Sequence, residues 1–192
     1  MPTLYSENLL EPEWTGELWG ASGRPVLLLT ETGEDRSAWW PVAARLAAVH
    51  SVAVLDLPSG GRIGDRAETL AEFVAGMGTR APVIAAHGRA AVIASLFACR
   101  YVAHGVAAIE QALDAPAEDG DTAAALEEIT AGPRKVECRY LSVFAAEPRP
   151  GYAAWLAERI PGAECAVYGT EGRYPHLSAP DRFTEDVSAL AS

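Results

Sequence analysis

Short apolar runs alternate with longer amphipathic segments along most of this chain. Runs that are apolar throughout are typical of strands covered on both faces, as in parallel sheets. They predict strands at residues 25–30, 51–56, 81–86, 105–109, 138–145 and 164–168. The intervening segments predict helices at 37–49, 65–78, 88–101, 122–130, 152–159 and 181–191. This alternation favours an α/β fold, a mostly parallel sheet with helices on both faces.

Polar residues at the segment ends refine this prediction. Ser37 and Asp65 stand where the first two helices would begin, and we expect them to act as N-caps. The segment 14–19 precedes the first predicted strand and indicates an antiparallel strand or hairpin at the sheet edge. Of the neighbouring Trp39 and Trp40, we expect one in the core and one at the surface.

The length of 192 residues and the absence of a linker predict one domain over residues 1–192. Residues 111–135 differ in character, because they are acidic and carry one short helical run. We interpret them as a short lid-like insertion.

Charge and cysteine content exclude several classes of partner. The formal net charge of −11, without a basic patch, argues against nucleic acid. The first residues lack a basic stretch followed by an apolar run, and no apolar run reaches the ~18 residues of a membrane span. These features predict a cytoplasmic protein without a membrane partner. The three cysteines lie in apolar segments and are expected to be buried, reduced thiols, with no metal site and no cofactor.

Several motifs, in order along the chain, resemble those of α/β-hydrolase-fold proteins. The strand at 25–29 (PVLLL) followed by 39–46 (WWPVAARL) is similar to the opening of that family. Residues 56–62 (DLPSGGR) resemble its Asp-Leu-Pro-Gly-His-Gly turn. Residues 172–183 (GRYPHLSAPDRF) resemble its C-terminal Gly-His-x-Pro-His-Leu segment. The resemblance covers the chain from about residue 14 to its end and implies an α/β-hydrolase-like sheet with a minimal cap.

The resemblance also implies that the hydrolytic residues are replaced. The family's nucleophile turn, Gly-x-Ser-x-Gly, corresponds to 86–90 (AHGRA), which places Gly88 at the nucleophile. Glycine tolerates the strained backbone of such a turn but offers no atom for an acyl-enzyme. Arg173 takes the place of the catalytic histidine, and arginine is a poor base because it stays protonated.

The remaining two parts of the hydrolytic machinery are altered as well. Glu147 is the nearest carboxylate to the position of the catalytic acid, and Glu110 and Asp114 are alternatives. The first strand ends in 30–33 (TETG) where the family has His-Gly, so Glu31 would repel an oxyanion there.

Ligands of such folds bind at the carboxyl ends of the strands. The resemblance places ten candidate site residues at that edge: Thr30, Glu31, Thr32, His87, Gly88, Arg89, Glu147, Arg173, Tyr174 and His176. We assign proton transfer to Glu31 and His87, and substrate binding to the other eight. Arg89 and Arg173 would pair with an anionic or zwitterionic small molecule or peptide. The alternatives are that the loop charges lie in water and that His87 and His176 have structural roles.

Two functions from different classes remain open at this point. The first is a non-hydrolytic tailoring enzyme, of epimerase, cyclase or lyase type, in a bacterial natural-product pathway or on another small-molecule intermediate. A single lysine, Lys135, among many alanines and arginines is typical of a GC-rich bacterium. The second is a pseudoenzyme that binds a ligand, a protein partner or a second copy of the chain. A conventional esterase would require a different nucleophile, and Ser59, Ser95 and Ser178 lack a strand–turn–helix context.

Overall fold

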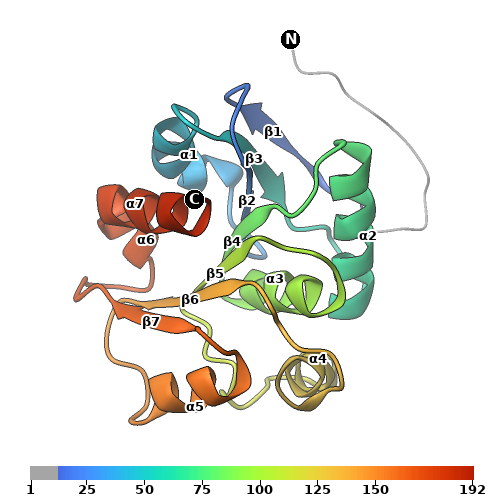
Figure 1. Cartoon of the computed structure of the whole chain (residues 1–192), viewed down its shortest axis with the longest axis vertical. Coiled ribbons are helices and arrows are strands. Elements are labelled where there is room, and N and C mark those ends of the chain that lie inside the picture. Colours follow the sequence, from blue (N-terminus) through green and yellow to red (C-terminus); the bar gives the residue numbers. More distant parts are fainter. Residues whose placement is uncertain (1–12) are drawn as a thin grey trace.

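The computed structural model describes residues 13–192, and the first residues, which lack a basic stretch followed by an apolar run, lie outside them. One seven-stranded sheet has the order β1-β3-β2-β4-β5-β6-β7 (Figure 1). Its strands are β1 (Thr15–Trp19), β2 (Pro25–Leu29), β3 (Ser51–Asp56), β4 (Val83–His87), β5 (Gly105–Ile109), β6 (Arg139–Phe144) and β7 (Glu164–Val167). The edge strand β1 pairs with β3 in the antiparallel direction, and the other neighbouring strands of the described sheet pair in parallel. This confirms the predicted fold class and the edge strand.

Helices cover both faces of the sheet (Figure 1). They are η1 (Arg36–Trp39, a 3-10 helix), α1 (Trp40–Leu46), α2 (Ile63–Gly76), α3 (Arg89–Arg100), α4 (Gly120–Ala131), α5 (Tyr152–Arg159), α6 (Pro175–Ser178) and α7 (Pro180–Leu190). Apolar residues of α2, α3, α4 and α5 share one core, and those of α1 and α7 share the other. Trp39 is buried and Trp40 is exposed, as predicted.

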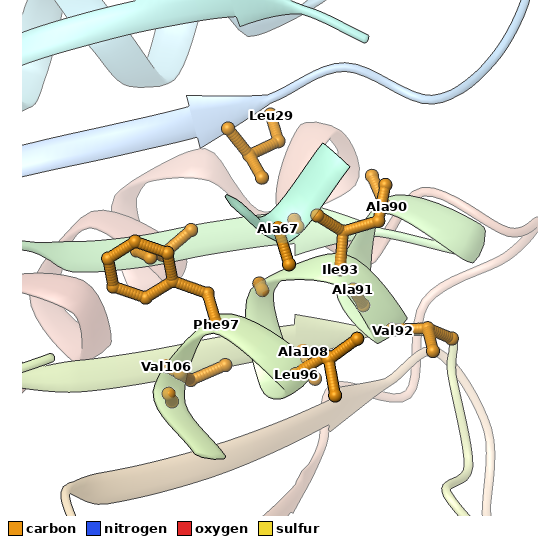
Figure 2. Packing of buried hydrophobic residues seen from close by; sticks show 14 of the residues in the cluster. Leu29, Ala67, Ala90, Ala91, Val92, Ile93, Leu96, Phe97, Val106 and Ala108 are labelled. Atoms are coloured by element: carbon orange, nitrogen blue, oxygen red, sulfur yellow. The ribbon is translucent and has the colours of Figure 1, made fainter. Parts of the chain in front are cut away.

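The continuous apolar runs arise because each strand serves both cores. Val26 and Leu28 of β2 belong to the core beneath α1 and α7, whereas Leu27 and Leu29 belong to the core beneath α3. Successive side chains of a strand point to opposite faces, so no polar position remains between them. Figure 2 shows α3 packing through Ile93, Leu96 and Phe97 and through small alanines near its start.

Helix starts are the main departure from the sequence prediction. The predicted helix 37–49 is a 3-10 turn followed by α1, and its cap is Asp35, whose carboxylate accepts from the Ser37 N–H at 2.8 Å. Likewise, α2 begins before Asp65, the third helical residue, whose carboxylate accepts from the N–H of the N-cap Arg62 at 3.2 Å. Both predictions placed the cap two or three residues too late, because apolar periodicity begins only after the first turn.

The predicted lid-like insertion, residues 111–135, packs beside α3. The N-cap of α4, Asp119, pairs with Arg89 at the start of α3 at 2.9 Å. Near the other end, both carboxylate oxygens of Glu128 accept from Arg100 at 2.7 Å. These pairs hold α4 beside α3, and residues 13–192 therefore include no large cap over the strand ends.

Candidate functional site

The candidate site forms where β2 and β4 end next to each other. These strands are parallel neighbours, and Leu29 is paired with Ala86 in their register. Glu31 follows β2 by two residues and Gly88 follows β4 directly. The register therefore brings residues 57 positions apart in the sequence to one edge of the sheet.

Gly88 forms a sharp turn between β4 and α3. Its backbone has φ 54° and ψ −129°, a region that a side chain disfavours and glycine accepts. The neighbouring Ala86 and Ala90 are fully buried, as the predicted turn requires. The expected strand–turn–helix geometry is therefore present, and Gly88 stands at its tip.

The carboxylate of Glu31 fills the space beside Gly88. A Cβ built on Gly88 would lie 1.7 Å from Glu31 Oε2. That oxygen accepts from the backbone N–H of Arg89, the first residue of α3, at 2.6 Å. The other oxygen, Oε1, accepts from the Thr32 N–H at 3.1 Å. A negative charge is favoured at a helix N-terminus, which explains why a carboxylate is stable here.

A second carboxylate, from Glu34, completes this arrangement. The Glu31 N–H donates to Glu34 Oε2 at 3.3 Å, and the Glu34 N–H donates back to the Glu31 carbonyl at 3.1 Å. Three backbone donors at the strand ends, from Glu31, Thr32 and Arg89, thus bind carboxylate oxygens of the chain itself. Such donors stabilise an oxyanion in enzymes of this geometry.

His87 lies behind the two carboxylates and is almost fully buried, with 3% of it exposed. Its Nε2 is 2.8 Å from the backbone carbonyl of Arg173. A carbonyl only accepts, so Nε2 carries a proton in this arrangement. Nδ1 then faces Glu34 Oε1 at 3.7 Å and Glu31 Oε2 at 4.0 Å. It has no hydrogen-bond partner.

Tyr174 covers His87 from the solvent side. The two rings stack with centroids 4.8 Å apart. The hydrogen bond to Glu34, together with the negative charge of that carboxylate, raises the pKa of Tyr174. The phenol is thus held protonated at an exposed position. We call the four contacting acidic and basic side chains at this edge the acid–base cluster: Glu31, Glu34, His87 and Tyr174.

His176 lies in the core beside this cluster. Its ring is 4.5 Å from that of Trp39 and 5.7 Å from that of Phe183, and it is 2% exposed. Burial, with a smaller effect of His87, lowers the pKa of His176 to about 3. The ring is therefore neutral at ordinary pH, in line with the structural alternative considered for this residue.

Two other candidate side chains, those of Thr30 and Arg89, have partners within the protein. A third candidate, Arg173, contributes its backbone to the site. The Thr30 hydroxyl is buried and bridges the Leu55 carbonyl and the Leu57 N–H, each at 3.1 Å. The Arg89 side chain pairs with two carboxylates of α4. Arg173 contributes its backbone carbonyl to His87, and its side chain is exposed.

The candidates for the acid position are spread along the strand ends. Glu147 is exposed beyond β6. Asp114 pairs with Arg149. Glu110 directly follows β5, has a positive φ of 55°, and accepts from the Ala145 N–H at 2.5 Å. Each of the last two carboxylates is therefore engaged within the sheet edge.

Glu34 was missed in the sequence analysis. Its only signal is a spacing of three residues from Glu31 across a glycine, a pattern that many loops share. The turn in which the Glu34 N–H reaches the Glu31 carbonyl brings the two carboxylates together.

Residues 13–192 hold neither a metal-binding cluster nor a helix that could span a membrane. No cluster of three or more histidine, cysteine, aspartate or glutamate side chains suited to a metal ion occurs among these residues. Within the same range, no helix combines the length and apolar character that crossing a bilayer requires.

Comparisons with known proteins identify the fold. No protein-family model matches the chain, and no curated protein matches it. Among solved structures, AqDC, described for ring cleavage of the Pseudomonas quinolone signal, has a TM-score of 0.77 at 13% identity, over 98% of this chain and 100% of its own. A thermophilic esterase from Thermogutta terrifontis has a TM-score of 0.68 at 19% identity, over 94% of this chain and 95% of its own. Est816, an N-acyl homoserine lactone degrading enzyme, has a TM-score of 0.70 at 17% identity, over 95% of this chain and 98% of its own. The chain has the α/β-hydrolase fold, and these structural neighbours are enzymes.

Proposed function

We propose that this protein is a non-hydrolytic enzyme that transfers protons on a small-molecule intermediate, as an epimerase, cyclase or lyase does. A bacterial natural-product pathway is the setting we infer, in the cytoplasm. The observation that carries this proposal is the position of the Glu31 carboxylate, which stands where a nucleophile's side chain would stand and is bound to the Arg89 N–H.

That position argues against acyl-enzyme hydrolysis. Gly88 offers no oxygen or sulfur to attack a carbonyl carbon. The donor that would stabilise the tetrahedral oxyanion, the Arg89 N–H, is occupied by a negatively charged group. We therefore infer that the triad chemistry of the fold is absent here.

The acid–base cluster supports proton transfer instead. Glu31 accepts a proton from the substrate, and His87 Nδ1, 4.0 Å from Glu31 Oε2, is the neighbouring acceptor. The Tyr174 phenol, hydrogen-bonded to Glu34, is a donor for the return of a proton. Removal and return of one proton leaves the substrate's composition unchanged, so an isomerisation needs no cofactor. General acid–base catalysis by positioned groups typically contributes about 10²- to 10⁴-fold in rate.

We assign substrate contacts to exposed groups at the same edge. The side chains of Thr32, Arg173 and Tyr174 are exposed there, and Arg173 is the cation we expect to meet an anionic substrate. Thr30 and Arg89 have internal partners, so their roles in binding are indirect.

Deuterium incorporation tests this proposal. The pure protein is incubated with source-cell extract in D2O, and the products are analysed by untargeted mass spectrometry. We expect a protein-dependent species with one deuterium gained, or a new isomer. Glu31→Gln and His87→Gln should each lower its rate by about 10²-fold or more. Glu68→Gln, an exposed carboxylate on α2, is the matched control and should keep the wild-type rate. Wild-type rates in both site variants would contradict the proposal.

A binding protein without chemistry is the second candidate, because the same donors are already occupied by Glu31 and Glu34. This reading predicts selective retention of one metabolite or protein from the extract without any deuterium gain. Substitution of Arg173 or Tyr174 should then weaken retention.

A further inference from the structure

The strand-end donors form a cradle that is shaped for a carboxylate. We use the term amide cradle for the N–H groups of Thr32 and Arg89, because the third strand-end donor, the Glu31 N–H, is bound to Glu34 at 3.3 Å. The two oxygens of the Glu31 carboxylate are divided between Arg89 at 2.6 Å and Thr32 at 3.1 Å. The present occupant itself shows which ligand chemistry fits, a planar group with two negatively charged oxygens.

An independent feature points into the same place. Nδ1 of the buried His87 has no hydrogen-bond partner, although buried polar atoms nearly always have one. It faces the Glu31 and Glu34 carboxylates from beyond hydrogen-bond distance. A buried polar atom that no group of the protein satisfies therefore lies beside the strand-end donors.

Glu31 is able to leave the amide cradle without a change of fold. Its side chain is 21% exposed, so one side of it faces solvent. The residue lies in a loop, after the end of β2, and its carboxylate is held by hydrogen bonds to backbone donors. Rotation about its side-chain bonds would free Arg89 N–H and the volume beside Gly88, where no Cβ intrudes.

We propose that the amide cradle is the binding site for a carboxylate group of the substrate, and that Glu31 occupies it until the ligand takes its place. This inference rests on the proposed function and names its substrate class, a small carboxylic acid. Exchange of one carboxylate for another leaves the charge in the cradle unchanged. Glu31, released from two backbone donors, is then free to act on a proton of the bound ligand.

The test measures binding alone, with acetate and formate as probes. Backbone amide resonances of Arg89 and Thr32 are followed by NMR in Glu31→Ala and in the wild type, with sodium chloride at equal ionic strength as the control for salt effects. We expect saturable shifts in Glu31→Ala at concentrations about tenfold or more below those needed by the wild type, because one charged hydrogen-bonding group no longer competes. Glu31→Gln, which keeps the side-chain volume but loses the charge, should need acetate concentrations between those of the wild type and of Glu31→Ala.

The absence of a saturable shift at Arg89 in Glu31→Ala, or saturation of wild type and variant at the same concentration, would overturn the inference. Glu31→Ser provides a second opened cradle if the alanine variant does not fold, and the same outcomes apply to it. The titration involves no turnover. Its failure would therefore leave the deuterium-exchange test of the proposed function standing, and failure of that test would leave acetate binding to be judged on its own.

Discussion

The carboxylate of Glu31 and a side chain at position 88 exclude each other, because a Cβ on Gly88 would lie 1.7 Å from Glu31 Oε2. The two residues come from the ends of neighbouring parallel strands. A glycine at the turn is thus required twice, by its positive φ and by the carboxylate beside it. A residue with a side chain at position 88 would therefore require the Glu31 carboxylate to move.

The first prediction separates these two requirements. Gly88→Ala should destabilise the wild type by about 3 kcal/mol, since it strains the backbone and breaks the charged hydrogen bond to Arg89. In a Glu31→Ala background only the strain remains, so the same substitution should cost about 2 kcal/mol less. Urea unfolding of the four proteins measures the coupling. Equal costs in both backgrounds would show that the two residues do not compete for space.

The second prediction concerns pH and His176. Its pKa is about 3 in the folded protein and near 6.5 when unfolded, so the unfolded chain binds more protons between these values. The stabilisation by neutral His176 is therefore complete above pH 6.5 and is lost as pH falls toward 3. From about pH 6.5 to about pH 5, the wild type should lose about 1 kcal/mol per pH unit more than His176→Phe. Parallel stability curves for the two proteins would count against this burial effect.

The third prediction tests how α4 is held. Arg100 donates two hydrogen bonds of 2.7 Å to Glu128, a paired geometry that lysine cannot reproduce. Arg100→Lys should lower the free energy of unfolding by about 1 kcal/mol and speed amide exchange within α4. Arg159→Lys on α5 is the control for exchange in α4, because its partner Glu158 lies 3.7 Å away, is 76% exposed and belongs to another helix. Unchanged exchange in α4 would mean that the pair between Arg100 and Glu128 does not hold the helix.

The fourth prediction concerns thiol reactivity. Burial raises the pKa of Cys138 to about 11, and it also raises the pKa of Cys99 and Cys165. At about pH 8 the thiolate fraction of Cys138 is then about one in a thousand, so reaction with a thiol reagent should be slow. All three thiols should react much faster in urea, which exposes them and lowers the pKa to its ordinary value. Cys99 is buried, whereas Cys138 and Cys165 are only partly buried, which corrects the expectation that all three thiols are buried. Rapid labelling of Cys138 in the folded protein would contradict the raised pKa.

Periodicity predicted the strands closely because burial on both faces leaves a simple pattern. Each of the six predicted parallel strands matches an observed strand to within two residues at either end, as 105–109 does for β5. Caps were less predictable, since Asp35 and Arg62 begin their helices before any apolar stripe is visible. A polar residue near a helix start has several competing partners, and the local turn decides among them.

The candidate site was predicted as a set of positions, not as a set of contacts. The sequence placed Glu31, Gly88 and His87 at one edge, and the parallel register brings the ends of β2 and β4 together there. It did not reveal that Glu34 joins them, or that the Arg89 side chain is paired with α4. Those contacts depend on a tight turn and on a helix that lies thirty residues further along the chain, so no local pattern records them.

The periodicity of the sequence by itself determined the α/β architecture, and the family resemblance of its motifs located the glycine after β4 and the carboxylate at the end of β2. Only the tertiary structure decided that this carboxylate lies on the helix N-terminus at Arg89, with His87 behind it. The physical reason is that strand pairing sets which chain ends meet, while hydrogen bonds of 2.6–3.3 Å then select one side-chain orientation among those that the loop allows.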